Sequence, residues 1–241
     1  MDTWHDLALQ KLRRHSQLTA KDEDLFRSLA GRMRSLEPGE DLVYQGDRPY
    51  AATLVVSGMI ARYHTMAAGR RQYLSFHFPG DWPDAQSILL ERMDHGVCAI
   101  GPASVACVRH DHLRTAFEAS SAVALALWRE TLVDAAIFRE AITNNSSRPA
   151  LARMAHLFCE LFYRAQSAGT VFGDSAALPF TQVQLGEALG MALVTVNRLL
   201  QALRRTETMN FRTGTLRVIH WDRLCEIGEF DPDYLSVSNP L

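Results

Sequence analysis

Cysteine is scarce in this sequence and lysine is almost absent. The 241 residues include two lysines, Lys11 and Lys21, so arginine supplies nearly all of the positive charge. The four cysteines lie far apart, with no CxxC pair and no zinc-finger spacing of histidine and cysteine: Cys98, Cys107, Cys159 and Cys225. This scatter excludes the clustered thiolates that hold an iron–sulfur cluster. It predicts reduced, mostly buried thiols, as in cytosolic proteins.

Long apolar runs are missing as well. No apolar stretch approaches about 18 residues, so the sequence predicts no membrane-spanning helix. The N-terminal sequence MDTWHDLALQ lacks the apolar core of a signal peptide. The net charge of −2 gives no overall electrostatic attraction to nucleic acid. We therefore expect a soluble cytoplasmic protein of one or two domains with no bound cofactor, in which any contact with nucleic acid comes from a local basic region.

Glycine and proline separate short strand-like runs in residues 35–110. The runs are Asp41–Tyr44, Thr53–Val56, Met59–His64, Gln72–Phe78, Val97–Ile100 and Val105–Arg109. Many short strands at this spacing predict a small antiparallel barrel or double-sheet roll. A short helix precedes the roll, with Thr19 as its N-cap and Gly31 at its end.

A long helix is predicted from Ala116 to Asn144, because this segment is rich in alanine and contains neither glycine nor proline. Alternating steps of three and four residues form a coiled-coil seam: Leu125, Trp128, Leu132, Ala135, Arg139 and Ile142. Further apolar surface comes from Val123, Leu127, Ile137, Phe138 and Ala141. A helix that is apolar on two sides must pack against two bodies. We expect the roll on one side and the same helix of a second subunit on the other, in a homodimer formed through residues 116–145.

The C-terminal part begins at a polar break, residues 144–149, which predicts a hinge. Pro149 suits the first turn of an amphipathic helix over residues 150–166. Thr181 and Gln184 then have capping-box spacing, Gly190 suits a tight turn, and a second helical pattern follows up to Arg205. Gly186 falls where the two short helices would cross. This is the spacing of a helix-turn-helix, whose second helix enters the DNA major groove.

The second helix has two distinct faces. Its apolar face holds Val196, Leu199, Leu200 and Leu203 at offsets of 0, 3, 4 and 7. The opposite face carries side chains that can read base edges: Val194, Asn197, Arg198, Gln201 and Arg205. Leu193 and Val194, near the start of the helix, are apolar side chains that suit contact with thymine methyl groups or a partner. Arg204 and Arg205 can meet phosphates at the helix end, and Thr181 and Gln182 can do so at the start of the first helix. Residues 207–219 predict a β-hairpin around Thr213-Gly214, which makes the domain a winged helix.

The order of roll, long helix and winged helix-turn-helix resembles the Crp/Fnr family of bacterial transcription regulators. The segments LEPGEDLVYQGD, LVVSGMIARY and FHFPGDW are similar to the family's glycine-marked turns, and LPFTQVQLGEALGMALVTVNRLLQALR is similar to its DNA-binding motif. The resemblance implies an α+β protein with a β-roll sensor in residues 1–115, a dimerisation helix in 116–145 and a winged helix-turn-helix in 146–241. It implies a homodimer on a palindromic double-stranded operator, with RNA polymerase and a small-molecule effector as further partners.

The resemblance also places the family's base-reading positions and its effector pocket. Arg198 matches an arginine that commonly contacts guanine, and Ala192 replaces a helix-capping serine. In the roll, the residues that correspond to the cyclic-AMP pocket are Trp82, Asp84, Ala85, His95 and Gly96. Ala85 cannot accept a hydrogen bond from ribose and Asp84 would repel a phosphate. We therefore predict that cyclic AMP is not bound in the usual manner.

Two other interpretations stay open from the residues alone. One is a cupin-like metal enzyme, because His110-Asp111-His112 is an HxH motif, although Glu118 follows too late for the cupin signature and Asp111 suits a helix N-cap. The other is a small-molecule-binding module whose C-terminal domain binds protein. Haem ligation by His77, His95 or Met93 is conceivable, but no spacing selects it. We expect no metal site and no catalytic residues.

Overall fold

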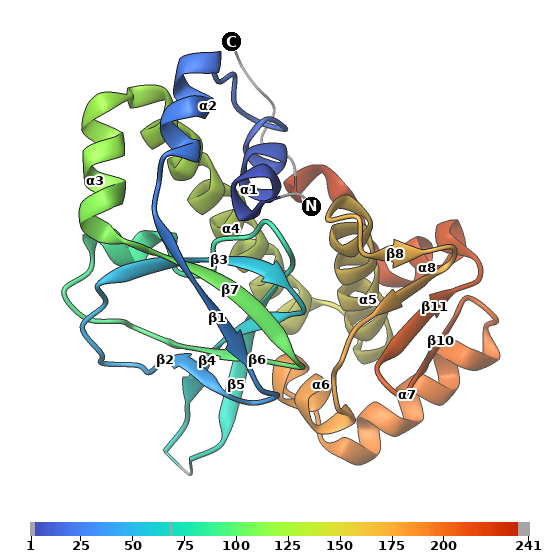
Figure 1. Ribbon diagram of the computed structural model, residues 1–241. Coiled ribbons are helices and arrows are strands. Elements are labelled where there is room, and N and C mark those ends of the chain that lie inside the picture. Colours follow the sequence, from blue (N-terminus) through green and yellow to red (C-terminus); the bar gives the residue numbers. More distant parts are fainter. Residues whose placement is uncertain (1–2, 68, 236–241) are drawn as a thin grey trace.

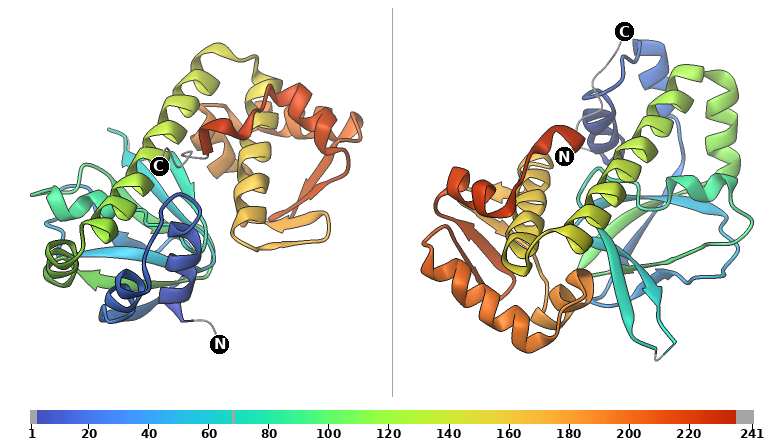
Figure 2. Two further views of the ribbon diagram at one scale, coloured as in Figure 1. Left: turned by 90° about the horizontal axis from the view of Figure 1, so that it is seen from above. Right: turned by 180° about the vertical axis from the view of Figure 1, so that it is seen from behind.

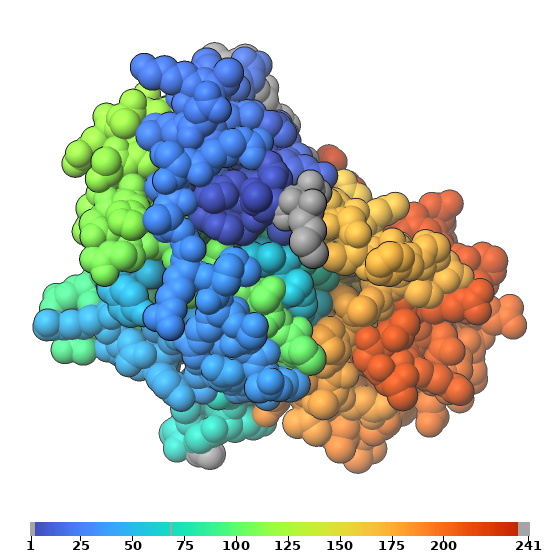
Figure 3. Space-filling view, viewed as in Figure 1, coloured from blue at the N-terminus to red at the C-terminus, as the bar shows by residue number. Residues whose placement is uncertain are grey.

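The chain forms two lobes joined by one long helix (Figures 1 and 3). The computed structural model describes residues 3–67 and 69–235. The N-terminal lobe contains the roll, and the C-terminal lobe contains the helices and small sheet of the predicted DNA-binding domain. No helix within the described ranges is long and apolar enough to cross a membrane.

Two short helices, α1 (Trp4–Leu12) and α2 (Ala20–Arg27), precede the roll. Thr19 caps α2 as predicted, and its side chain and that of Asp22 form a reciprocal capping box. The helix does not extend to Gly31. Gly31 instead begins the first strand, where the indole of Trp4 lies so close that an added Cβ would be 2.8 Å from it. The sequence analysis missed α1 altogether.

The roll consists of two antiparallel sheets with strand orders β1-β7-β3 and β2-β6-β4-β5. The strands are β1 (Gly31–Leu36), β2 (Asp41–Val43), β3 (Ala51–Ser57), β4 (Ile60–Thr65), β5 (Arg71–His77), β6 (Gly96–Ala99) and β7 (Ala103–Arg109). The predicted double-sheet roll is confirmed. Strand β1 was not predicted, because it is an edge strand with only Leu36 buried and lacks an apolar alternation.

The predicted long helix is two helices, α3 (His110–Ala119) and α4 (Ser121–Ser147). Ser120 has an extended backbone (φ −147°), and its hydroxyl accepts a hydrogen bond from the Val123 amide at 3.2 Å. It therefore ends one helix and caps the next.

The other predicted helix ends differ in detail. Asp111 is not an N-cap, because Arg109 occupies the N-cap of α3 and Asp111 lies in the first turn. At the other end, α4 continues through most of the predicted hinge and stops only before Arg148 and Pro149. Pro149 occupies the N-cap of the next helix and not its first turn.

Helix α4 runs along the outside of the roll toward the C-terminal lobe (Figure 2). One side packs into the roll through Val123, Ala126 and Leu127, together with Leu113 and Ala116 of α3. The predicted seam lies on the other side and is open to solvent in the protomer: Leu125, Trp128, Leu132 and Ile142 are exposed. The helix therefore has the two faces that the sequence predicted.

The C-terminal lobe is a helical layer over a four-stranded antiparallel sheet of order β10-β11-β9-β8. Its elements are α5 (Ala150–Ser167), β8 (Val171–Phe172), β9 (Ser175–Ala177), α6 (Gln182–Leu189), α7 (Leu193–Arg205), β10 (Met209–Arg212), β11 (Thr215–Val218), α8 (Trp221–Gly228) and a short 3₁₀ turn, η2 (Pro232–Leu235). The predicted hairpin is present, and Thr213 and Gly214 both take positive φ at its tip. Strands β8 and β9 were not predicted.

The two lobes share an apolar contact between β5 and α6. The rings of Phe76 and Phe180 meet edge to face with centroids 4.5 Å apart. Two glutamines bridge the same boundary: the Gln72 side chain donates to the Glu187 carbonyl, and Gln184 donates to the Tyr73 hydroxyl at 3.4 Å. The DNA-binding domain is therefore docked on its own roll.

Candidate nucleic-acid interface and sensor cavities

Helices α6 and α7 form the predicted helix-turn-helix. The Thr181 hydroxyl accepts from the Gln184 amide at 3.2 Å, and the Gln184 side chain accepts from the Thr181 amide at 2.8 Å. Gly190 ends α6 in the left-handed region with φ 64°. A Cβ on Gly186 would lie 2.6 Å from the Met191 carbonyl, so the crossing of the two helices requires glycine here.

The recognition helix α7 is held by its apolar face and presents its polar face to solvent. Val196, Leu199, Leu200 and Leu203 are buried against the core of the lobe. The nine residues predicted to touch DNA are all exposed: Thr181, Gln182, Leu193, Val194, Asn197, Arg198, Gln201, Arg204 and Arg205. Val194 is 80% exposed, which is unusual for an apolar side chain in a well-packed domain.

The start of α7 carries no side-chain cap. Ala192 occupies the N-cap and makes no side-chain hydrogen bond. The first amides of this helix therefore have no side-chain acceptor at the cap, next to the exposed Leu193 and Val194. At the wing, one of the expected basic side chains is already paired, since the Arg217 Nε donates to Asp174 at 2.7 Å. Residues 198–217 contain five arginines, Arg198, Arg204, Arg205, Arg212 and Arg217, so this count overstates the positive charge that is free to meet phosphates.

The predicted effector residues divide between two different cavities of the roll. Trp82 and Ala85 line an open apolar groove of about 510 Å³ beside α3 and α4. His95 lines a separate cavity of about 360 Å³ between the second sheet and α4. Gly96 lines neither, because the Tyr63 ring lies against it and an added Cβ would be 2.3 Å from that ring. The predicted effector residues therefore do not all line one cavity, although the groove and the cavity adjoin, since Gln86 and Thr131 line both.

Asp84 is buried and serves the structure of the roll. Its carboxylate accepts a hydrogen bond from the Thr53 amide at 2.6 Å. Burial raises the pKa of Asp84 to about 6, against the opposing effect of the Thr53 hydrogen bonds. The carboxylate is neither exposed nor placed on the lining of either cavity.

The cavity that holds His95 has a buried arginine in its wall, which the sequence analysis missed. Arg62, in β4, is 2% exposed and pairs with Asp134 of α4 at 2.6 Å. Its guanidinium also lies over the Phe138 ring, 5.5 Å from the centroid. The Nδ1 of His95 contacts Asp94 at 2.7 Å, whereas its buried Nε2 has no hydrogen-bond partner among the described residues. The signal that could have indicated this buried cation was the position of Arg62 inside the strand-like segment MIARYHT. This site is called the Arg62 cavity below.

The histidines that the sequence offered as metal or haem ligands do not gather at one place. His110 is buried and contacts the Ser87 hydroxyl at 2.9 Å, while His112 is half-buried. His77 is buried beside Ser75, and burial holds its pKa well below the usual value. Met93 is packed in a separate apolar cluster. Within residues 3–67 and 69–235, no group of three or more histidine, cysteine or acidic side chains could hold a metal ion.

Comparison with known proteins agrees with this architecture. Residues 33–120 match the cyclic nucleotide-binding domain, and residues 152–227 match the Crp-like helix-turn-helix domain. The chain is 26% identical over 181 residues to the transcriptional activator protein FnrL of Cereibacter sphaeroides, covering 71% of this chain and 70% of that protein. The structure of FixK2 from Bradyrhizobium japonicum superposes with a TM-score of 0.74 at 25% identity, covering 83% of this chain and 98% of that one.

The chain belongs to the Crp/Fnr family of transcription regulators. The fold is shared more widely than the sequence. A Crp/Fnr regulator from Eubacterium rectale has a TM-score of 0.62 at 16% identity, covering 88% of this chain and 96% of that one. The protein is therefore a regulator with a helix-turn-helix DNA-binding domain. The alternative of a C-terminal domain that binds only protein is wrong.

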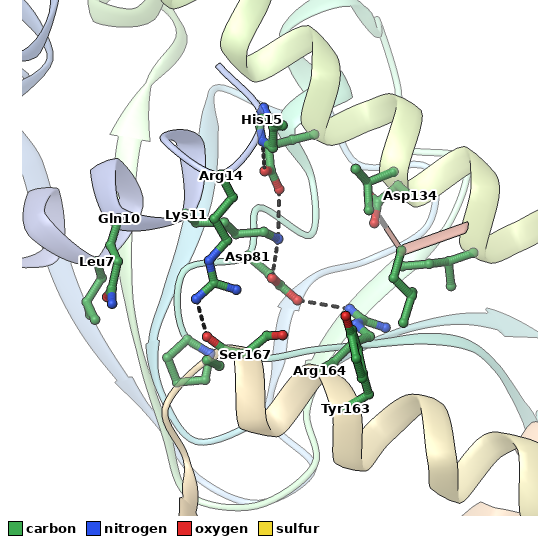
Figure 4. Close-up of a pocket in the computed structure, with 16 residues that line it drawn as sticks. Leu7, Gln10, Lys11, Arg14, His15, Asp81, Asp134, Tyr163, Arg164 and Ser167 are labelled. Carbon is green, nitrogen blue, oxygen red and sulfur yellow. Dashed lines mark hydrogen bonds and ion pairs between the residues drawn. The ribbon is translucent and has the colours of Figure 1, made fainter. Parts of the chain in front are cut away.

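A buried cluster of charges joins the roll to three helices of this Crp/Fnr regulator, α1, α4 and α5 (Figure 4). Asp81 of the roll contacts Lys11 of α1 and accepts from Arg164 of α5 at 2.9 Å. Lys11 also reaches Glu130 of α4 at 2.7 Å. These four residues, called the Asp81 cluster below, line a cavity of about 200 Å³ between the lobes. Sequence analysis missed these residues because they lie far apart in the sequence and meet only in the folded chain. Lys11 and Glu130, for example, are 119 positions apart.

The raised pKa of Asp84 predicts a specific pH dependence of stability. A carboxyl with a higher pKa in the folded state favours folding when it is protonated, and this contribution is lost as the pH rises through the folded value of about 6. The variant Asp84→Asn keeps an acceptor for Thr53 but cannot ionise. Its free energy of unfolding, relative to the natural protein, should rise between pH 4 and pH 7 by at most roughly 3 kcal/mol. Urea unfolding across that range measures the difference.

Asp24→Asn, at an exposed position of α2, serves as the control and should show no such trend. If the difference in free energy of unfolding between the Asp84→Asn variant and the natural protein does not change with pH, Asp84 is already ionised in the folded protein at pH 4.

Proposed function

We propose that this regulator binds a palindromic double-stranded DNA operator as a homodimer and reads it with two copies of α7. The observation that carries the proposal is the exposed polar face of α7, which is held rigidly by the buried apolar face of the same helix. The proposal includes no catalytic activity. Two linked helix-turn-helix domains reach successive major grooves about 34 Å apart, which favours an operator with twofold symmetry.

Each side chain on this face has a distinct role in the proposal. Arg198 can grip guanine through two hydrogen bonds, and Asn197 or Gln201 can grip adenine in the same way. The exposed Val194 suits contact with a thymine methyl group. Arg204 and Arg205 follow at the end of the helix, where phosphate contacts fix the position of the domain without reading sequence. The exposed N-terminus of α6, with Thr181 and Gln182, provides further phosphate contacts.

The dimer in this proposal forms through α4. Four apolar side chains of the seam are exposed in the protomer: Leu125 (57%), Trp128 (55%), Leu132 (43%) and Ile142 (69%). They follow one stripe along a helix whose opposite side is buried in the roll, so an identical helix is the natural partner. The apolar groove at Trp82 is continuous with this stripe, since Leu125 and Trp128 line both. RNA polymerase remains a proposed partner for which no surface is assigned.

The Arg62 cavity is the proposed effector site. It lies between the roll and α4, and the Arg62–Asp134 pair joins the two across it. A ligand that binds here alters α4 only through different affinity for two arrangements of that helix. The cavity wall offers a buried cation and the unpartnered His95 Nε2 to an acceptor group.

Arg198→Ala should relax the choice of base at one position of each half-site. The lost contact should cost about 1–3 kcal/mol of discrimination between the preferred base and its competitors. Binding constants for the selected operator and for single-base variants, measured at fixed salt, test this. Arg204→Ala is the matched control: it should weaken all sequences about equally and flatten the dependence of affinity on salt. Unchanged affinity and preference in Arg198→Ala would mean that α7 is oriented differently on DNA.

Leu132→Asp should break the dimer, because it places charges from two subunits in the centre of an apolar seam. Sedimentation equilibrium should then report a monomer at concentrations where the natural protein is dimeric, and affinity for a palindrome should fall toward that for a half-site. Phe172→Asp is the control, since Phe172 is 82% exposed on the C-terminal lobe. A natural protein that is already monomeric, or a variant that stays dimeric, would remove α4 as the interface.

Cyclic AMP should not bind with micromolar affinity. The positions that correspond to the ribose and phosphate contacts are the aliphatic Ala85 and the paired His95, and Asp84 is occupied by Thr53. Calorimetric titration with millimolar cyclic AMP tests this expectation, with DNA binding measured in parallel. Micromolar binding, or cyclic-AMP-dependent operator affinity, would contradict it.

A further inference from the structure

Two of the four cysteines meet within the DNA-binding domain. Cys159 lies on α5 and Cys225 on α8, and both belong to the apolar cluster where these two helices pack antiparallel, with His156 beside Gly228 and Phe162 beside Trp221. Cys159 has no exposed surface, whereas Cys225 is partly exposed at the edge of the same apolar cluster. The other two, Cys98 and Cys107, are in the roll, on β6 and β7. Neither the recognition of DNA nor the effector site uses the Cys159–Cys225 pair.

The backbones of α5 and α8 approach closely beside the two thiols. A Cβ on Gly228 would lie 2.7 Å from the His156 amide nitrogen and 3.0 Å from its Cα, so these helices almost touch where glycine is present. Cys159 is three residues after His156, and Cys225 is three residues before Gly228. The two thiols are therefore neighbours one turn away from the closest point of the helix pair. A disulfide requires such a short separation of the two backbones.

The two thiols are chemically unequal. Their mutual contact lowers the pKa of Cys225 and raises that of Cys159, and burial raises the pKa of Cys159 further. Exposure decides which thiol meets a peroxide first, because solvent reaches Cys225 whereas Cys159 has no exposed surface. In the roll, burial raises the pKa of Cys98 to about 11 and raises that of Cys107 as well. The chain places one activated thiol beside a buried thiol that can resolve it.

We propose that Cys225 and Cys159 are an oxidative modification site that reacts with hydroperoxides and closes to an intramolecular disulfide. In the first step the Cys225 thiolate attacks one oxygen of hydrogen peroxide, the O–O bond breaks, and the departing hydroxide takes a proton to leave as water. In the second step the Cys159 sulfur, having lost its proton, attacks the sulfenic sulfur of Cys225. The S–O bond breaks and a second water leaves. Two thiols and one peroxide become one disulfide and two waters.

The disulfide would tie the C-terminal helix to the central helix of the DNA-binding domain. Tyr234, after α8, already donates to Glu160 of α5 at 2.9 Å, so the segment is anchored beside the cysteines. The crosslink closes a long loop that contains the whole helix-turn-helix and wing. It therefore restricts the unfolded state of the domain and should raise its unfolding temperature by several degrees.

The experiment treats the full-length natural protein with excess hydrogen peroxide and counts free thiols after denaturation. We expect two of the four thiols to disappear, the intact mass to fall by two hydrogens, and a non-reducing peptide map to link Cys159 to Cys225. Dithiothreitol should restore all four thiols. Loss of no thiols, loss of thiols in the roll at the same rate, or disulfides only between chains would each overturn the proposal. None of these measurements involves DNA or the effector.

Two variants separate the roles of the cysteines. Cys159→Ser should stop the reaction at a sulfenic acid on Cys225, which dimedone traps and mass spectrometry locates. Cys225→Ser should react at least tenfold more slowly, because the remaining thiol is buried. Cys107→Ser is the matched control and should form the disulfide at the natural rate. A Cys159→Ser protein that gives no dimedone adduct at Cys225 would show that this thiol is not activated.

Discussion

The relative position of the two lobes depends on one buried carboxylate. Asp81 is 6% exposed and is held by the Phe78 amide at 2.9 Å, by Arg164 at 2.9 Å and by Lys11. These cations keep the pKa of Asp81 well below its usual value despite burial. Burying charges costs free energy, and removing one member of such a group leaves the others uncompensated. The Asp81 cluster therefore contributes less to total stability than to the choice of a single docked arrangement.

This arrangement makes the N-terminal helix part of the regulator's mechanism. Lys11 of α1 bridges Asp81 of the roll and Glu130 of α4, so one ammonium group touches both the roll and the proposed dimer helix. The Arg62–Asp134 pair makes a second connection from the roll to α4, on the wall of the proposed effector cavity. A ligand that draws Arg62 away from Asp134 weakens one of these two connections. The Asp81 cluster would hold the lobes together while α4 adjusts.

Sequence patterns predicted the elements whose cause is local. The N-cap at Thr19, the capping box at Thr181, the left-handed Gly190 and the two faces of α7 all follow from spacing within one or two turns, and the structure contains each of them. The break at Ser120 escaped prediction because serine has no strong helix-breaking signal within an alanine-rich run. It becomes a cap only because Asp22 of α2 also accepts from its hydroxyl, at 2.6 Å. Strand β1 escaped prediction for a similar reason. It is a strand because it pairs with β7, and its own sequence has no strand pattern.

The candidate sites differ in the same way: the residues of one are close in sequence, and those of the other are brought together only by folding. The residues predicted to face DNA lie on one short helix and its neighbour, so helical periodicity and the family resemblance together could find them. The predicted effector residues lie on the segment from Trp82 to Ala85, where a short 3₁₀ turn begins, and around the start of β6 at Gly96. Position in the sequence could not show that they would line two adjoining cavities or none. Arg62 and Asp134 are 72 residues apart, and only the packing of α4 on the roll pairs them. Contacts of this kind define the proposed effector site. A candidate ligand for it must therefore be sought from the shape and charge of the folded cavity, whereas the proposed base contacts follow from the sequence of one helix.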